Sequence, residues 1–183
     1  MNNSHGELAS NIKISGRFFC FASCLAAYGV SEAEVKAAYI LNFAKFVEWP
    51  SQQKPNNTIL QLCITRPDAL DGKLQQLNGR QAGGMVIHVH PADLSQEWNT
   101  CQIVFLSAED MDRSPTLLST LSKHPVLTIS DTPDFVMHGG VIGFLLQDNR
   151  VKFSVNLGVA KATGLHLSAR LLQVADTIYA EPR

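Results

Sequence analysis

The clearest periodic pattern of apolar and polar positions lies in residues 31–50. At about 100° per residue, one sector of a helix collects the apolar side chains. These are Val35, Tyr39, Ile40, Phe43, Phe46 and Val47. Charged residues fall on the opposite side, at Glu34, Lys45 and Glu48. The segment is therefore predicted to be an amphipathic helix that covers the core of a soluble domain, and not a span across a bilayer.

Both ends of this helix carry sequence signals. Ser31 and Glu34 have the S-x-x-E spacing of a capping box, in which each side chain accepts a hydrogen bond from the other residue's backbone N–H. Pro50 disfavours helical geometry at the residue before it, so the helix is expected to end at Trp49. The aromatic residues of this segment are expected in the core. A ligand-stacking role for the aromatics near Trp49 is the alternative.

The middle of the chain alternates between strand-like and helical patterns. Apolar runs of strand length occur at residues 58–65, 85–90, 101–107 and 125–130. Leucines at helical spacing predict a helix from Pro67 to Leu77, and Ser114-Pro115 opens another short helix. Short apolar strands that alternate with helices are typical of an α/β domain, with a largely parallel sheet and helices on both faces.

The end of the chain departs from this alternation. Two apolar runs flank Asp148-Asn149-Arg150, which predicts an antiparallel hairpin closing the sheet. Residues 156–164 are expected to be helical and to stop at Gly164. Ser168 is expected to cap a final helix that continues to Tyr179. Its inward-facing residues would be Leu171, Leu172, Ala175 and Ile178.

The N-terminal region has the composition of an export signal. Lys13 and Arg17 precede an apolar run, Phe18 to Val30, whose length suits a signal peptide and is too short for a membrane span. Small residues around Ala27 and Gly29 predict cleavage near residue 29. Residues 1–29 are therefore expected to be a cleaved signal peptide, and residues 30–183 a single periplasmic domain. An uncleaved anchor, a buried helix and a lipid anchor at Cys24 are the alternatives.

Charge and cysteine content limit the candidate partners and compartments. The chain has 15 basic and 16 acidic residues, with no run of Lys or Arg, so nucleic acid is not an expected partner. The predicted signal contains Cys20 and Cys24, which leaves Cys63 and Cys101 in the mature protein. An even pair in an oxidising compartment predicts one disulfide, which requires the first and third strands to be neighbours. Two unrelated buried thiols are the alternative.

The sequence contains no recognisable catalytic constellation. There is no G-x-S-x-G elbow, Walker loop or G-x-G-x-x-G motif, so no catalytic residues and no cofactor are expected. His88 and His90 share one face of a predicted strand and are the best metal candidates. No third ligand lies at useful spacing, and exposed histidines at a strand end remain the favoured interpretation. The acidic residues Glu109, Asp110 and Asp112 are expected to stand before a helix start, where they complement its dipole.

Four stretches of the chain carry a family resemblance. They are EVKAAYILNFAKFVEWP, LQLCI, CQIVFLS and VKFSVNLGVAKATGLHLSARLLQVA, which extend from about Glu34 to Ala175. The most specific parts are the end of the first helix at Trp49-Pro50 and a closing pattern. That pattern comprises Phe153, Asn156, Leu157, Ala160, Gly164, Leu165, Leu167, Ser168, Arg170, Leu171 and Leu172. Together these stretches resemble the YfiR family of bacterial periplasmic proteins.

The resemblance implies a fold and a function. Members of the YfiR family have an α/β fold around a largely parallel sheet. They bind the periplasmic sensor domain of an inner-membrane diguanylate cyclase and hold that enzyme off, which restrains cyclic di-GMP synthesis and biofilm formation. An OmpA-like outer-membrane lipoprotein can relieve the repression by sequestering the inhibitor. The resemblance thus implies a repressor, not an enzyme, with a homodimer as a further candidate assembly.

Individual positions of the family pattern carry over in part. Cys63 and Cys101 match one family disulfide, whereas the second pair would fall around Phe135 and Phe144, where this sequence has no cysteine. Redox control that requires both bridges is therefore in doubt. Asn156 and Arg170 are expected to be polar anchors for the last helices. The competing function is a periplasmic small-molecule binding module with a pocket at the carboxyl ends of the strands.

Overall fold

The computed structural model describes residues 29–51, 58–91, 93, 98–113 and 115–180. The predicted signal peptide lies outside these residues except for Gly29. The helices are α1 (Glu32–Phe46), α2 (Ala108–Arg113), α3 (Pro115–Leu121), α4 (Leu157–Ala162) and α5 (Ala169–Gln173). The strands are β1 (Val47–Glu48), β2 (Ile59–Ile64), β3 (Gln81–Ala82), β4 (Met85–Pro91), β5 (Ile103–Leu106), β6 (Leu127–Ser130), β7 (Ile142–Gln147), β8 (Arg150–Asn156), β9 (His166–Leu167) and β10 (Thr177–Tyr179).

The described strands form one eight-stranded sheet and a two-stranded pair. The sheet order is β10-β8-β7-β6-β5-β2-β4-β3, and β1 pairs with β9 separately. From β4 through β2, β5 and β6 to β7, neighbouring strands are parallel. The β7–β8 hairpin and the β3–β4 pair are antiparallel. The predicted α/β class is confirmed, including the largely parallel sheet and the closing hairpin.

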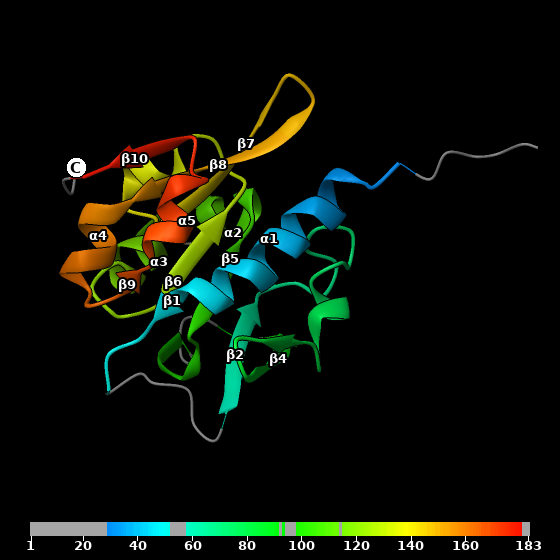
Figure 1. Cartoon of the computed structure of the whole chain (residues 1–183), viewed down its shortest axis with the longest axis horizontal. Coiled ribbons are helices and arrows are strands. Elements are labelled where there is room, and N and C mark those ends of the chain that lie inside the picture. The colour runs from blue at the N-terminus through cyan, green and yellow to red at the C-terminus, as the bar shows by residue number, and fades with distance from the viewer. Residues whose placement is uncertain (1–28, 52–57, 92, 94–97, 114, 181–183) are drawn as a thin grey trace, which may run out of the picture.

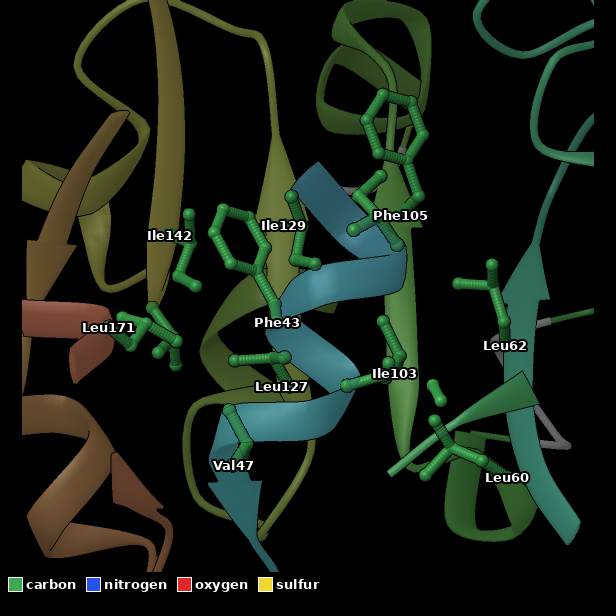
Figure 2. Packing of buried hydrophobic residues seen from close by; sticks show 14 of the residues in the cluster. Phe43, Val47, Leu60, Leu62, Ile103, Phe105, Leu127, Ile129, Ile142 and Leu171 are labelled. Carbon is green, nitrogen blue, oxygen red and sulfur yellow. The ribbon is translucent and has the colours of Figure 1, made fainter. Parts of the chain in front are cut away.

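Apolar side chains cover both faces of the sheet. Helix α1 lies across one face (Figure 1), and Figure 2 shows Phe43 pointing from α1 toward Ile129 and Ile142. Helix α3 covers the opposite face, where Leu118 and Leu121 pack with Cys63. Because successive residues of a strand point to opposite faces, β5 fills both cores, and β2 supplies leucines to one core and Cys63 to the other. β6 supplies its apolar residues, Leu127 and Ile129, to the core beneath α1 only. Helices therefore lie on both faces, as the sequence predicts.

Helix α1 starts as predicted and ends three residues early. The Ser31 N–H donates to Glu34 Oε2 at 2.9 Å, and the Glu34 N–H donates to Ser31 Oγ at 3.2 Å, which confirms the capping box. The helix ends at Phe46, because Val47 adopts an extended conformation (φ −115°, ψ 136°) and pairs with Leu167 of β9. The prediction that the helix continues to Trp49 is wrong.

The predicted helix over residues 67–77 is also wrong. Leu70 and Asp71 both have left-handed φ angles, of 51° and 52°, and Gly72 follows at 71°. Consecutive left-handed residues interrupt a right-handed helix. The segment therefore forms turns and a short 3-10 helix, Gln75–Leu77. Leu74 and Leu77 are buried nevertheless, since the turns direct them into the core.

The closing hairpin is confirmed, and the last helix is shorter than predicted. Asp148 and Asn149 have φ angles of 50° and 58°, the left-handed values that a tight two-residue hairpin turn requires. Helix α5 ends at Gln173, and the chain then forms β10 beside β8. Ile178 consequently lies on an edge strand and is 43% exposed, not turned inward as predicted.

Within the part of the chain that the structure describes, no helix has the length and apolarity of a membrane span.

Candidate functional site: a charged cavity at the strand ends

A cavity of about 450 Å³ opens at the carboxyl ends of β2, β5 and β6, beside the first turns of α1. Its lining residues are Glu32, Ala33, Lys36, Arg66, Asp68, Ala69, Leu70, Asp71, Ser107, Ala108, Glu109 and Asp131. The volume lies in the range of small-molecule sites, about 300–1,000 Å³. The wall contains five carboxylates and two cations, so the cavity is strongly polar.

The position of the cavity follows from the strand order. From β2 the chain passes to β4 on one side, and the next strands, β5, β6 and β7, follow in order on the other side of β2. The five parallel strands thus have the order 2-1-3-4-5 of one doubly wound sheet type, with the reversal between β2 and β5. Open α/β sheets bind ligands outside the carboxyl ends at such a reversal. Arg66 follows β2 there, and Ser107 follows β5.

Lys36 connects α1 to the end of β6. Its Nζ lies 2.8 Å from Asp131 Oδ2 and 2.5 Å from Glu32 Oε1, and its side chain is only 9% exposed. Burial by itself lowers the pKa of Lys36, but the hydrogen bonds and charges of Asp131 and Glu32 together raise it above its usual value. The side chain therefore stays charged and holds α1 against the sheet.

Arg66 joins the loop after β2 to helix α2 at the wall of the cavity. Its Nε and Nη2 donate to the two carboxylate oxygens of Asp68 at 3.1 and 2.9 Å, and its Nη1 pairs with Glu109. The hydrogen bonds between these two side chains lower the pKa of Asp68 and raise the pKa of Arg66. Both groups remain ionised at neutral pH, and the pair of Arg66 with Glu109 links the loop after β2 to α2 by charge.

The acidic residues singled out from the sequence precede α3, as predicted, but they lie within a helix of their own, α2, with Glu109 and Asp110 in its first turn. Asp110 is buried, and its Oδ2 accepts hydrogen bonds from the N–H and the hydroxyl of Ser107, both at 2.8 Å. This contact fixes the turn between β5 and α2. Glu109 points to Arg66, and Asp112 is exposed. The three residues therefore have separate roles, and Glu109 belongs to the cavity.

His88 and His90 do share one face of β4, with ring centroids 5.8 Å apart. His88 Nδ1 lies 2.8 Å from Gln61 Oε1, and His90 Nε2 lies 3.7 Å from Cys63 Sγ. His88 is exposed and His90 is half-buried. The described residues contain no group of three His, Cys, Asp or Glu side chains arranged to hold a metal ion.

Cys63 and Cys101 form a disulfide with a Cα–Cα distance of 5.8 Å. Cys63 lies in β2, and Cys101 stands just before the neighbouring β5, so the sheet order brings the two together. Both cysteines are fully buried in the core beneath α3. The bridge connects residues 38 positions apart and lies in the core, away from the charged cavity.

The two residues expected to be polar anchors, Asn156 and Arg170, lie in different environments. Asn156 is a polar anchor: its Oδ1 accepts from the Val159 N–H at 2.9 Å and its Nδ2 donates to the Val136 carbonyl at 2.8 Å. Arg170 is exposed on α5, so the expectation of an anchor is wrong there.

Phe135 and Phe144 stand where the family resemblance places a second disulfide. The two side chains occupy separate cores, so they do not replace that bridge by packing against each other.

Lys36 is the principal residue of the cavity that sequence analysis missed. Its i,i+4 spacing from Glu32 is visible in the sequence, but its partner Asp131 lies 95 residues away. Trp49, by contrast, does not line this cavity. Its indole donates a hydrogen bond to the Gln102 carbonyl, near the amino end of β5. The aromatic segment at Trp49 and the carboxyl ends of the strands, the two places where the sequence suggested a pocket, therefore lie at opposite ends of the sheet.

Among solved structures, the fold is similar to that of a conserved domain protein from Vibrio cholerae O1 biovar El Tor strain N16961. The TM-score is 0.54 at 8% sequence identity, and the match covers 81% of this chain and 60% of that chain. The chain thus spans about 60% of that protein's length. At this identity the similarity concerns the fold alone.

A protein-family model gives a more specific match. The model described as YfiR/HmsC-like matches residues 33–176, from the first turn of α1 to the residue before β10. This match supports a regulatory rather than a catalytic protein, periplasmic in location and connected with cyclic di-GMP signalling in general. The matched segment includes the whole charged cavity except Glu32. The chain belongs to the YfiR/HmsC-like family.

Proposed function

We propose that this protein is a periplasmic repressor that binds the periplasmic sensor domain of an inner-membrane diguanylate cyclase. The observation that carries the proposal is the family match, which extends over nearly all of the described domain. Binding would restrain cyclic di-GMP synthesis and, with it, biofilm formation. An OmpA-like outer-membrane lipoprotein that sequesters the repressor would restore cyclase activity.

Repression through a sensor domain requires unequal affinity for two states of the cyclase. A ligand that binds both states equally shifts no equilibrium, however tightly it binds. The repressor must therefore bind the inactive conformation of the sensor domain more tightly than the active one. Contact at the periplasmic side is sufficient, because the sensor domain transmits its state across the membrane.

The direct test is capture of the partner. The mature protein, residues 30–183, is immobilised and exposed to detergent-solubilised membranes of its own host. Recovery of a membrane protein with a periplasmic domain and a cytoplasmic cyclase domain is the expected result, followed by binding to the purified periplasmic domain alone. Failure of that isolated domain to bind, with the mature protein folded, would contradict the proposal.

A second candidate function is small-molecule binding, which the charged cavity favours. The cavity lies at the strand reversal where α/β sheets take ligands, and it contains the buried Lys36. Native mass spectrometry of protein isolated from its own periplasm tests this candidate. A bound small molecule that is absent from a Lys36→Met variant would support it, and an unliganded mass under the same conditions would count against it.

A further inference from the structure

The ammonium group of Lys36 has one hydrogen-bond donor more than its neighbours use. A lysine Nζ carries three N–H donors. Two of them meet Glu32 Oε1 and Asp131 Oδ2, at 2.5 and 2.8 Å, and the described residues supply no acceptor for the third. The Lys36 side chain is only 9% exposed and lines the charged cavity. Because buried donors are ordinarily hydrogen-bonded, this third N–H is expected to meet an oxygen acceptor within the cavity.

The carboxylate of Asp131 also has bonding capacity that the protein leaves unused. Its Oδ2 accepts from Lys36, whereas its Oδ1 has no hydrogen bond to the described part of the chain. The Asp131 side chain is 29% exposed and lines the same cavity. An ionised carboxylate has about four acceptor sites, so Asp131 can accept a further donor while it holds Lys36. The pair thus offers a donor and an acceptor side by side, just beyond the carboxyl end of β6.

The remaining charges of the cavity favour a cationic ligand. Five carboxylates and two cations line it, so the wall carries three excess negative charges. Arg66 is already held by Asp68 and Glu109, whereas Asp71 is exposed and forms no ion pair among the described residues. A hollow lined mainly by one sign of charge raises the local concentration of the opposite charge. A ligand with a net positive charge is therefore favoured over a free anion.

The size and the apolar part of the lining favour a single small molecule. The cavity measures about 450 Å³, and its lining includes Ala33, Ala69, Leu70 and Ala108. Small-molecule sites combine such apolar contacts with a few polar groups that fix the orientation of the ligand. A compact carbon skeleton that carries both a cation and an oxygen acceptor meets all of these conditions.

We propose that the cavity binds a small amine that also carries hydroxyl or carbonyl oxygens, such as an amino sugar or an amino alcohol. The ammonium group of the ligand donates to Asp131 Oδ1 and lies near Asp71. One oxygen of the ligand accepts the third N–H of Lys36. The inference rests on small-molecule binding, the second candidate function, and does not depend on the partner cyclase.

Isothermal titration calorimetry of the mature protein with glucosamine tests the inference, in a buffer that keeps the amine protonated. Glucosamine presents an ammonium group and hydroxyl groups on one six-membered ring. N-acetylglucosamine keeps the hydroxyl groups without the charge, and cyclohexylamine keeps the charged ring without the oxygens. The expected result is saturable binding of glucosamine that is at least about tenfold tighter than binding of either other compound.

Two single substitutions locate the binding in the cavity. Asp131→Asn removes the charge beside Lys36 and should weaken glucosamine binding by at least about tenfold. Asp71→Asn should weaken it about two- to fivefold, because an exposed charge pair contributes less. Asp134→Asn is the matched control and should leave binding unchanged. Asp71 and Asp134 are both exposed with left-handed φ angles, of 52° and 56°, but Asp134 lies outside the cavity. Thermal melts verify that each variant is folded.

The outcomes separate this inference from the two candidate functions. Absence of saturable glucosamine binding by the folded protein would overturn the inference, even where native mass spectrometry finds another bound molecule and the second candidate function stands. Binding that is unchanged in both Asp131→Asn and Asp71→Asn would place the ligand elsewhere and overturn it as well. Equal affinity for cyclohexylamine would remove the oxygen contact, and equal affinity for N-acetylglucosamine would remove the ammonium contact. Either result would overturn the proposed ligand chemistry.

Discussion

The indole Nε1 of Trp49 donates a hydrogen bond to the backbone carbonyl of Gln102, at 3.1 Å. The same carbonyl accepts the Leu127 N–H at 2.9 Å, and the Gln102 side chain accepts the Gln61 N–H at 2.9 Å. Gln102 thus joins the chain that leaves α1 to three neighbouring strands, one residue after the disulfide-bonded Cys101. The contact fixes the segment after α1 to the amino ends of these strands, although Trp49 and Gln102 are 53 positions apart in the sequence.

Replacement of Trp49 by Phe should lower the free energy of unfolding by about 1 kcal/mol, because the ring stays buried while one hydrogen bond is lost. Trp49→Ala should cost about 3–5 kcal/mol through the cavity it leaves. Urea denaturation measures both values. Trp98→Phe is the control, since Trp98 is only half-buried. Equal costs for the two Phe variants would contradict the role of the Gln102 contact.

Loss of the disulfide should lower stability by about 2–5 kcal/mol, the range typical of a native bridge in a small secreted domain. The variant is Cys63→Ala with Cys101→Ala, which avoids an unpaired thiol. Thermal melts in oxidising buffer compare it with the unchanged protein, and added reductant should bring the unchanged protein close to the variant. A melt identical to that of the unchanged protein would show that the bridge contributes nothing.

Lys36→Ala should destabilise the domain by about 1–3 kcal/mol, because Asp131 loses its only cation among the described salt bridges. Lys45 on the same helix is exposed and hydrogen-bonds only Asn42 among the described side chains, so Lys45→Ala should change stability by less than about 0.5 kcal/mol. Chemical denaturation of both variants decides the comparison. Similar effects from the two lysines would refute the account of Lys36 as the link between α1 and β6.

Stability should fall in acid through three paired carboxylates. The Lys73 hydrogen bond lowers the pKa of Glu34 below its ordinary 4.5, and Arg66 and Lys152 lower the pKa values of Asp68 and Asp176 below 3.8. Because the folded pKa lies below the unfolded one, each contribution is complete above the ordinary pKa and is lost as pH falls through the folded value.

The melting temperature should therefore be flat near neutral pH and decline below about pH 4.5. Glu34→Gln can keep the capping box but not the ion pair with Lys73, so it should flatten the upper part of the decline. The exposed Glu48→Gln is the control and should leave the profile unchanged. An acid profile that is the same in both variants would contradict the assignment to Glu34.

Local and alternating patterns made much of the fold predictable. The capping box of Ser31 and Glu34, the hairpin turn at Asp148 and the apolar runs of β2 and β5 each depend on neighbouring residues or on two-sided burial. The capping box and the hairpin turn were predictable because the residues that form them lie within a few positions of each other. The disulfide joins residues 38 positions apart, and its prediction required only that β2, which contains Cys63, lie beside β5, which Cys101 precedes.

The wrong predictions arose where distant contacts override local preference. Leu74 and Leu77 have the same spacing whether turns or a helix bury them, and the left-handed angle of Leu70 leaves no sequence signal. Thr177 and its neighbours join β8 because the Asp176 N–H bonds the Phe153 carbonyl at 2.9 Å. The position of the cavity was predictable, because α/β sheets bind ligands at the carboxyl ends of their strands. The role of Lys36 was not, because it depends on Asp131, which only the folded sheet brings near.

The measurement that tests the central claim most directly is cellular cyclic di-GMP in a deletion strain of the host. Complementation uses two versions of the gene, the full chain and one that lacks residues 1–29. The account predicts that deletion raises cyclic di-GMP and surface attachment, that the full chain restores repression, and that the version without the export signal does not. Unchanged cyclic di-GMP in the deletion strain across several growth conditions, or full rescue by the version that is not exported, would contradict it.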